Sequence, residues 1–259
     1  MSRPAAGGGR WVEVAPERLE RWLAGFAERH GGLQAVKPEP ADPEDTDAER
    51  TDPVPDAVVA RAADGSTVDV HLPFPARVRP MSLADVVAEA RRPRRVGLVL
   101  VRRGGHAVAV LDGPRVVDAK VGSRHVQGRT AAGGWSQRRY ARRREGQARV
   151  AAAAAADTVA ALLLPELSGL EAVATGGDRP MLGAVLADSR LAALRPLVVE
   201  RVLDVAEPRR AVLEQAVAQA RAVRVRIVDP LEGAGPPQPP GAAASQAGTR
   251  SADSGGAKR

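Results

Sequence analysis

The chain of 259 residues has no cysteine and very few aromatic residues. The lack of cysteine excludes disulfide bonds and every metal site that needs a thiolate ligand, so stability does not depend on a redox compartment. Aromatic residues make up only 2% of the sequence, whereas hydrophobic residues make up 44%. We therefore expect a core that is built from valine, leucine and alanine.

Long apolar segments are also missing. The N-terminal residues contain no apolar region of the kind found in signal peptides. The nearest approach to a membrane span, residues 150–164, is short, rich in alanine and interrupted by Asp157. These features predict a soluble, cytoplasmic protein with no membrane partner.

Lysine is scarce, and arginine supplies almost all of the positive charge. Lysine occurs only at positions 37, 120 and 258, yet the net charge is +7. The abundance of arginine, alanine, glycine and proline is typical of a GC-rich genome, so the net charge alone is weak evidence for a nucleic-acid partner. Its location is more informative, because the positive charge is concentrated between residues 120 and 149.

Composition divides the chain into an N-terminal region, a main domain and low-complexity ends. The N-terminal region is expected to be a small α+β unit that contains an acidic, proline-rich loop. The tail is rich in glycine, alanine and proline and is expected to be disordered. The expected boundaries are 1–9 for a disordered leader, 10–95 for the N-terminal region with its acidic loop at 35–56, 96–230 for the main domain and 231–259 for the tail.

Local patterns in the N-terminal region predict two helices and a hairpin. Proline at the first helical position, followed by apolar residues every three to four positions, indicates a helix after Pro16. Alternating segments around Asp64-Gly65 indicate a β-hairpin with a two-residue turn. Ser82, with Asp85 three residues later, is typical of a helix start.

The main domain begins with three strands that short glycine turns separate, which predicts an antiparallel meander. A long helix and then alternating strands and helices follow. This order predicts an α/β fold, a layered sandwich of ribonuclease-H-like architecture. The expected strands are 97–103, 106–112, 115–121, 170–176, 197–205 and 223–229, and the expected helices are 136–164, 181–194 and 209–222.

Carboxylates are poorly placed for metal chemistry in this domain. An authentic ribonuclease H site needs several carboxylates that converge on two metal ions. The expected first strand carries no acid, while Asp112 and Asp118 fall in a turn and at a strand end. The sequence therefore predicts no metal and no organic cofactor, and it disfavours a metallonuclease.

Other residues with chemical potential lack supporting partners in the sequence. His106 and His125 could act as general bases, but His106 follows a Gly-Gly turn and is interpreted as structural, and His125 as an RNA contact. No nucleophile-elbow pattern surrounds Ser123 or Ser136. Gly176-Gly177 is interpreted as a turn that opens a helix rather than as a phosphate-binding loop.

The most informative segment is a glycine-bearing loop that leads into an arginine-rich helix. Gln137 stands at their junction, and its amide can orient a water or stabilise an oxyanion, although it cannot act as a general base. Arginines three and four residues apart repel one another on a helix, so a polyanion would relieve them. A solvated basic helix is the alternative. The candidate RNA contacts are Lys120, Arg124, Arg129, Arg138, Arg139, Arg142, Arg143 and Arg144.

Residues 128–144, GRTAAGGWSQRRYARRR, resemble the catalytic loop and following helix of the eukaryotic and archaeal class-1 peptide-release factors. In those factors a Gly-Gly-Gln tip precedes an arginine-rich helix. Here Gly133 and Gly134 match the glycines, but Trp135 occupies the glutamine position and the glutamine stands at Gln137. This Gly-x-x-Gln variant is similar to the release-factor-like peptidyl-tRNA hydrolases, which include a bacterial branch. The resemblance covers about residues 96–230.

The resemblance implies hydrolysis of the peptidyl-tRNA ester on stalled ribosomes or large subunits. It implies that Gln137 is the catalytic residue, that Gly133, Gly134, Trp135 and Ser136 shape the catalytic loop, and that the following arginines contact RNA. Two alternatives remain open: a nuclease that cuts near the tRNA acceptor end, and a non-catalytic module that binds RNA or ribosomes. The sequence identifies no protein partner and no role for residues 1–95.

Overall fold

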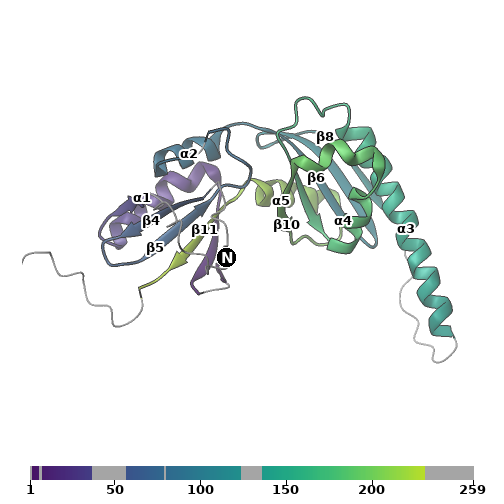
Figure 1. Ribbon diagram of the computed structural model, residues 1–259, viewed down its shortest axis with the longest axis horizontal. Helices are drawn as coiled ribbons and strands as arrows, with labels where there is room; N and C mark the ends of the chain where they lie inside the picture. Colours follow the sequence, from purple (N-terminus) through teal and green to yellow (C-terminus); the bar gives the residue numbers. More distant parts are fainter. Residues whose placement is uncertain (1, 6–7, 37–56, 79, 124–135, 231–259) are drawn as a thin grey trace, which may run out of the picture.

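The protein is a mixed α/β structure with two β-sheets, which form the two lobes in Figure 1. This computed structural model describes residues 2–5, 8–36, 57–78, 80–123 and 136–230, and for Ser2, Ser123 and residues 136–145 it describes the backbone alone. Within these ranges no helix has the length and apolar character needed to cross a membrane.

The first lobe contains a six-stranded sheet in which every neighbouring pair is antiparallel. The strand order is β1-β2-β11-β5-β4-β3, so the last strand of the chain lies between strands from its beginning. The strands are β1 (Ser2–Pro4), β2 (Arg10–Val14), β3 (Leu33–Ala35), β4 (Ala57–Ala62), β5 (Thr67–His71) and β11 (Val223–Val228).

Two helices cover one face of this sheet. They are α1 (Leu19–Arg29), which continues the short 3-10 helix η1 (Pro16–Arg18), and α2 (Leu83–Arg91). The apolar face of α1 buries Leu19 and Phe26 against alternate residues of the strands, such as Val68 and Val225. The alternation of apolar and polar residues in β4, β5 and β11 thus matches a sheet with one buried face.

Both helix starts and the hairpin of this lobe lie where they were expected. The N–H of Asp85 donates to Oγ of Ser82 at 3.1 Å, which confirms the N-terminal cap of α2. The hairpin is confirmed, but the expected two-residue turn is wrong. The N–H of Ala62 donates to the carbonyl of Ser66 at 2.8 Å, so three residues form the loop. Gly65 has a φ of +91°, the conformation that such three-residue loops require.

The second lobe contains a five-stranded sheet with the order β10-β9-β6-β7-β8. The antiparallel meander of β6, β7 and β8 confirms the expected three-strand start of the main domain. β9 runs parallel to β6, and β10 runs parallel to β9. The strands are β6 (Arg95–Arg102), β7 (Gly105–Asp112), β8 (Arg115–Ser123), β9 (Ala172–Gly177) and β10 (Val198–Leu203).

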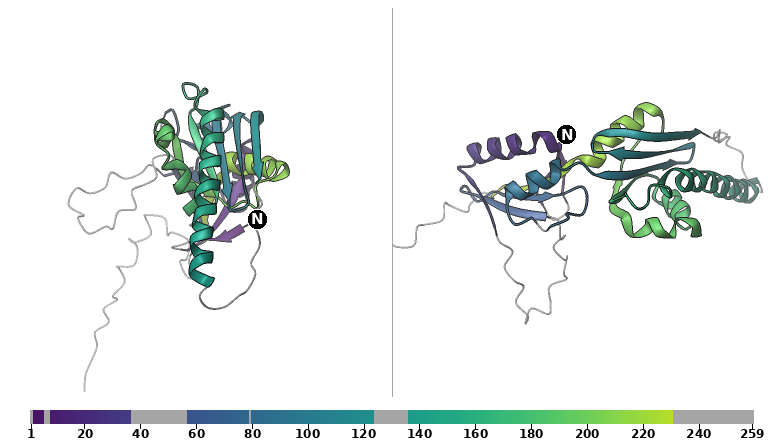
Figure 2. Two further views of the ribbon diagram at one scale, coloured as in Figure 1. Left: turned by 90° about the vertical axis from the view of Figure 1, so that its right-hand side faces the viewer. Right: turned by 90° about the horizontal axis from the view of Figure 1, so that it is seen from above.

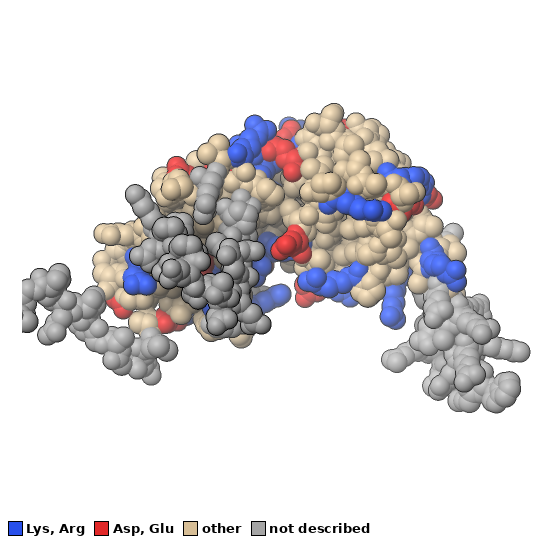
Figure 3. Space-filling view, viewed as in Figure 1, with Lys and Arg blue, Asp and Glu red and all other residues tan. Residues whose placement is uncertain are grey.

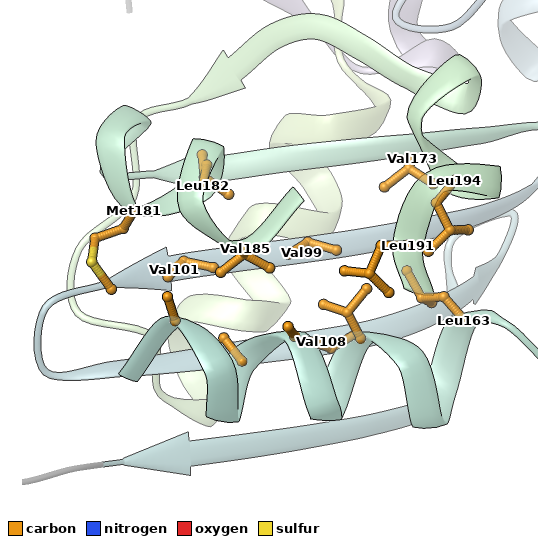
Figure 4. Close-up of a cluster of buried hydrophobic side chains, with 14 of the residues drawn as sticks. Val99, Val101, Val108, Leu163, Val173, Met181, Leu182, Val185, Leu191 and Leu194 are labelled. Carbon is orange, nitrogen blue, oxygen red and sulfur yellow. The ribbon is translucent and has the colours of Figure 1, made fainter. Parts of the chain in front are cut away.

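Helices cover both faces of the second sheet, so the lobe is a three-layer sandwich. Val99 and Val101 of β6 lie in the core on one face, whereas Leu98 and Leu100 lie in the core on the other. Figure 4 shows the first of these cores between the sheet and its helices. The helices on that face are α3 (Ser136–Leu163), α4 (Arg179–Leu186) and the 3-10 segment η2 (Ser189–Leu197), and α5 (Arg210–Arg221) covers the opposite face.

One expected helix is divided in two. Residues 181–194 were expected to form a single helix, but α4 ends at Leu186 and η2 begins at Ser189. The carboxylate of Asp188 accepts a hydrogen bond from the N–H of Arg190 at 3.0 Å. A short polar side chain that binds the backbone in this way favours a helix end over a helix interior, and the expectation of one helix was wrong.

Two further expectations fail because strand partners lie far away in sequence. Residues 223–229 were assigned to the main domain, but β11 pairs with β2 and β5 of the first sheet. Residues 1–9 were expected to be a disordered leader, but Ser2–Pro4 form β1 and pair with β2. Alternation within a segment predicts a strand, yet it does not say which strand lies beside it.

Ion pairs join the two lobes. Arg92, after α2, donates to both oxygens of Glu171, just before β9, at 2.7 and 3.3 Å. Arg221 of α5 contacts Glu17 of the first lobe at 2.5 Å. Figure 3 shows basic and acidic side chains next to one another where the lobes meet. The second lobe is therefore tied to the first by charged contacts as well as by the chain itself.

Candidate functional site at the start of helix α3

Helix α3 is the longest element of the structure and combines two different surfaces. Its 28 residues correspond to a length of about 42 Å. The C-terminal half belongs to the core, where the buried residues Ala152, Ala155, Ala156, Val159 and Leu163 face the sheet. Alanines at this interface bring the helix close to β7, against which it packs. The rest of α3 extends beyond the sheet (Figures 1 and 2).

The start of the helix extends beyond the sheet (Figure 1). Among the α3 residues whose side chains the structure describes, 146–163, the first that packs against the core cluster is Ala148. Gln137 precedes it by eleven residues, which is about 16 Å along the helix axis. Between them, a Cβ added at Gly146 would meet no atom within 4 Å. The backbone of Gln137 is therefore carried away from the body of the second lobe.

The predicted site residues fall into four groups. Ser136 and Gln137 are the first two residues of α3, so the expected helix start is confirmed. Lys120 is exposed on β8, opposite Val108 of β7. The remaining arginines of the site on α3, whose backbone alone is described, are Arg138, Arg139, Arg142, Arg143 and Arg144. Gly133, Gly134, Trp135, Arg124 and Arg129, together with His125, lie outside the described residues.

The electrostatics of the helix start favour an anion. The first N–H groups of a helix lack partners within the helix, and the helix dipole adds partial positive charge at this end. The first turn of α3 contains no acidic residue, whereas Arg138 and Arg139 follow Gln137. Cations at the positive end of a dipole are unfavourable in isolation. A bound phosphate or a developing oxyanion at this position would offset that cost.

His106 anchors the core half of α3 to the sheet. Nε2 of His106 lies 2.9 Å from Oγ1 of Thr158, and that hydroxyl donates to the carbonyl of Ala154 at 3.0 Å. The imidazole also fills the space above Gly122, where a Cβ would approach Cε1 to 2.4 Å. Burial lowers the pKa of His106, and the charge of Lys120 lowers it further. These contacts support the structural interpretation of His106.

No local sequence pattern indicates the partner of His106. Thr158 lies 52 residues away, and Gly122 is opposite His106 only through the register of β7 and β8. A cavity of about 100 Å³ borders the same histidine. It is lined by Val101, Arg102, Arg103, Gly105, His106, Ala151 and Ala154.

Gly176 and Gly177 are explained by packing, as expected for a turn that opens a helix. A Cβ at Gly177, whose φ is +105°, would lie 2.1 Å from the carbonyl oxygen of Val101. The carboxylate of Asp178 then accepts from the N–H of Met181 at 3.1 Å and caps α4. This turn therefore serves the junction between β9 and α4.

Acidic residues of the second lobe do not gather around the expected site. Asp112 is exposed at the end of β7, and Asp118 is exposed on β8 opposite Val110. In the part of the chain that the structure describes, no three histidine, aspartate or glutamate residues come together as metal ligands would. The chemistry available at the start of α3 is thus that of an amide, hydroxyl and guanidinium groups, and helix N–H groups.

Comparison with known families identifies the second lobe. The family described as Actinobacteria/chloroflexi VLRF1 release factor matches residues 94–226, which is 133 of the 259 residues. The match begins just before β6 and ends within β11, so it contains the whole five-stranded sheet and α3.

Comparison with solved structures gives weaker likenesses. The chain is similar to the crystal structure of the archaeal translation termination factor aRF1, with 18% identity and a TM-score of 0.35, over 62% of this chain and 51% of that one. A structure described as an archaeal protein gives 16% identity and a TM-score of 0.34, over 62% and 52%. The chain thus spans about half the length of these structures. No curated protein sequence matches it.

Proposed function

The chain belongs to the Actinobacteria/chloroflexi VLRF1 release-factor family, and on this premise we propose that it is a peptidyl-tRNA hydrolase. Its proposed substrate is the ester that joins a nascent chain to tRNA on a stalled ribosome or large subunit. Its partners are then the large subunit and peptidyl-tRNA, and its site of action is the cytoplasm, where translation takes place.

The position of Gln137 carries this proposal. The residue lies in the first turn of α3, about 16 Å along the helix axis from the core contact at Ala148, and this end of the helix extends beyond the sheet (Figure 1). A peptidyl-tRNA ester inside a ribosome is surrounded by RNA, so a group that reaches it must stand away from the body of its protein. A projecting helix start with arginines behind it meets this requirement.

In the proposed reaction the amide of Gln137 orients a water molecule towards the ester carbonyl. The water oxygen attacks the carbonyl carbon, and the bond from that carbon to the ribose oxygen of the tRNA breaks. One proton of the water passes to the leaving ribose oxygen and the other is released to solvent, which yields a peptide carboxylate and a tRNA hydroxyl. An amide does not accept that proton, so we assign its transfer to groups of the RNA and the substrate.

The N-terminal end of α3 assists in two ways in this proposal. Its free N–H groups and the helix dipole stabilise the negative charge that develops on the carbonyl oxygen. The arginines at 138, 139 and 142–144 bind phosphates next to the ester and hold the tip in place. Gly133, Gly134 and Trp135 shape the loop before the helix, and Lys120, Arg124 and Arg129 add RNA contacts near its ends.

We also propose that the second lobe has a ribonuclease-H-like fold. The support is the strand order of its sheet, in which a three-strand meander is extended on the side of its first strand by two parallel strands. In this proposal the catalytic domain comprises roughly residues 96–222, and residues 10–95 form a separate N-terminal unit that β11 completes.

Replacement of Gln137 by alanine tests the mechanism. Purified protein would be incubated with large subunits that carry a nascent chain on tRNA, and the peptide and tRNA products would be separated. We expect Q137A to lose release by at least about 100-fold, the magnitude seen when one transition-state contact is removed. Cosedimentation with large subunits should be unchanged. Gln147, ten residues further along the same helix, provides the matched control Q147A, which should release normally.

The products separate the alternatives. Release of intact tRNA supports ester hydrolysis, whereas a tRNA shortened at its 3′ end would indicate a nuclease and refute the proposed reaction. Cosedimentation of the wild-type protein without any release would indicate a non-catalytic ribosome-binding module. Normal release by Q137A would refute the role of the glutamine.

A further inference from the structure

The first sheet has a second face that no helix covers in the described part of the chain. α1 and α2 lie on one face (Figure 1), and the strand residues that alternate with the buried ones point to the other. We call this second surface the open face. Its residues in the central strands and their neighbours include Arg3, Trp11, Glu13, Val59, Arg61, Asp69, His71, Arg224 and Arg226.

The open face carries more positive than negative charge. Arg3, Arg61, Arg224 and Arg226 face only two carboxylates on its strands, those of Glu13 and Asp69. β10 adds a further cation, because Nη2 of Arg201 lies 2.6 Å from Oε1 of Glu13. Among the described residues, this gives five guanidinium groups to two carboxylates.

These cations are close enough to repel one another. Burial lowers the pKa of the Arg201 guanidinium, and Glu13 partly offsets this effect. The neighbouring charges of Arg224 and Arg3 lower the same pKa further. Arg226 lies 3.7 Å from a carboxylate oxygen of Asp69 and donates to the carbonyl of Gly8 at 3.2 Å. The guanidinium groups of this surface therefore repel one another, and an anionic ligand would reduce that repulsion.

An aromatic pair lies in the middle of this charge. The guanidinium of Arg224 is 4.0 Å from the centre of the Trp11 ring, and the His71 ring meets Trp11 edge-on with centroids 5.0 Å apart. Burial lowers the pKa of His71, so this ring is neutral at pH 7 and adds no charge. Trp11 is partly exposed. The chain has only six tryptophan, tyrosine and phenylalanine residues, and one of these few therefore lies at the surface rather than in a core.

This combination is typical of a surface that binds single-stranded RNA. Flat sheets with central aromatic residues stack unpaired bases, and arginines around them bind the phosphates. A membrane surface would need many protruding apolar side chains, but the strongly exposed large aliphatic residues of the open face, among those described, are Val59 and its neighbour Val36 at the edge of the sheet. The two outer arginines, on β1 and β4, are four strand spacings apart, about 19 Å, which gives room for several nucleotides.

We propose that the open face is a binding site for single-stranded RNA, in which Trp11 stacks on a base and Arg3, Arg61 and Arg226 bind phosphates. The site is separate from the start of α3, and seven of the nine residues named for the open face precede residues 94–226, the part of the chain that the release-factor family matches. RNA binding at the open face does not require that the protein hydrolyse peptidyl-tRNA.

Charge reversal on the two faces of the first lobe tests this site. Binding of a fluorescent 12-residue oligouridine would be followed by anisotropy, with the full-length chain carrying R142Q and R143Q so that α3 contributes less. Arg3 and Arg61 are exposed on the open face, and Arg21 and Arg29 are exposed on α1. The variants R3E/R61E and R21E/R29E therefore change the net charge equally on opposite faces.

We expect R3E/R61E to weaken RNA binding about tenfold and to reduce the slope of log affinity against log salt by about 1.4, since each phosphate contact with single strands contributes about 0.7. R21E/R29E should change affinity less than about twofold. W11L should weaken binding while W11F retains it, because phenylalanine still stacks. Circular dichroism and thermal unfolding of each variant would verify the fold.

Three outcomes would overturn the proposal. Equal losses in the two charge-reversed variants would mean that net charge alone attracts the RNA. Unchanged binding in R3E/R61E would remove the open face as a site. Binding to phosphatidylserine vesicles with the same dependence on Arg3 and Arg61, in the absence of oligouridine binding, would assign the face to a membrane. None of these three outcomes depends on whether Q137A loses peptide release. The RNA-binding proposal and the proposed function can therefore fail independently.

Discussion

Replacing Val225 by alanine should destabilise the first lobe, although this residue follows the second lobe in sequence. Val225 is fully buried and lies between Val12 of β2 and Val70 of β5. The substitution removes two methyl groups, worth about 0.8 kcal/mol each, and leaves a cavity in a close-packed core. We expect the free energy of unfolding of the first lobe to fall by about 2–3 kcal/mol.

Hydrogen exchange with mass spectrometry would locate the effect. Amides of β2 and β5 should lose protection in V225A by a factor that matches the loss of stability, whereas those of β6 and β9 should keep theirs. Val228 lies on the same strand but points to the opposite face and is partly exposed, so V228A is the matched control. It should cost less than about 0.5 kcal/mol.

The reasoning behind this prediction would be refuted by exchange that rises first in β6 and β9. That result would mean that β11 is energetically part of the second lobe, as its position in the sequence suggests. A cost in V228A as large as that in V225A would refute the assignment of the two faces of the sheet.

Two further predictions concern the second lobe. In chemical denaturation, G177A should destabilise it by at least about 2 kcal/mol, because φ is +105° and the new Cβ would meet a carbonyl oxygen at 2.1 Å. G183A is the matched control, because a Cβ at Gly183 meets nothing within 4 Å. It should stabilise helix α4 by about 0.5–1 kcal/mol. NMR titration should find the pKa of His106 below 6.5 and should find it raised in K120Q, since burial and Lys120 both lower it. Because the unfolded chain then binds the proton more readily, stability should decrease as the pH falls below about 6.5, and a stability that increases there would contradict this sign.

The elements of the second lobe were predictable because their signals are local. The meander, the long helix and the parallel strands each follow from short runs of apolar residues between glycine turns. The cap of α2 at Ser82 was predictable for the same reason, since its partner lies three residues away. Where a short-range interaction decides the structure, the sequence around it is sufficient.

The failures have two physical causes. The three-residue loop at Gly65 depends on a backbone hydrogen bond, and the break at Asp188 depends on a backbone N–H that donates to a side-chain carboxylate. The position of β11 depends on partners about 155 and 210 residues earlier in the chain. The alternation of apolar and polar residues shows that one face of a strand is buried, but it does not show in which sheet the strand lies.

The candidate sites differ in the same way. Gln137 was predicted from a motif within 17 consecutive residues, so no knowledge of the fold was needed. The open face was not predicted, because Arg3, Arg61 and Arg224 come together only through the order β1-β2-β11-β5-β4. Its arginines are far apart in the sequence, and only the pairing of the strands brings them close together.

β11 joins the two lobes, and it therefore connects the two proposed RNA-binding surfaces. The strand begins two residues after α5 of the second lobe, contributes Val225 to the first core and places Arg224 against Trp11 on the open face. The ion pair between Arg92 and Glu171 restrains the same junction. When one surface is bound to RNA, the other is then held near that RNA at a high effective concentration. A basic sheet that binds weakly by itself would thus still increase the time for which the start of α3 remains near the substrate.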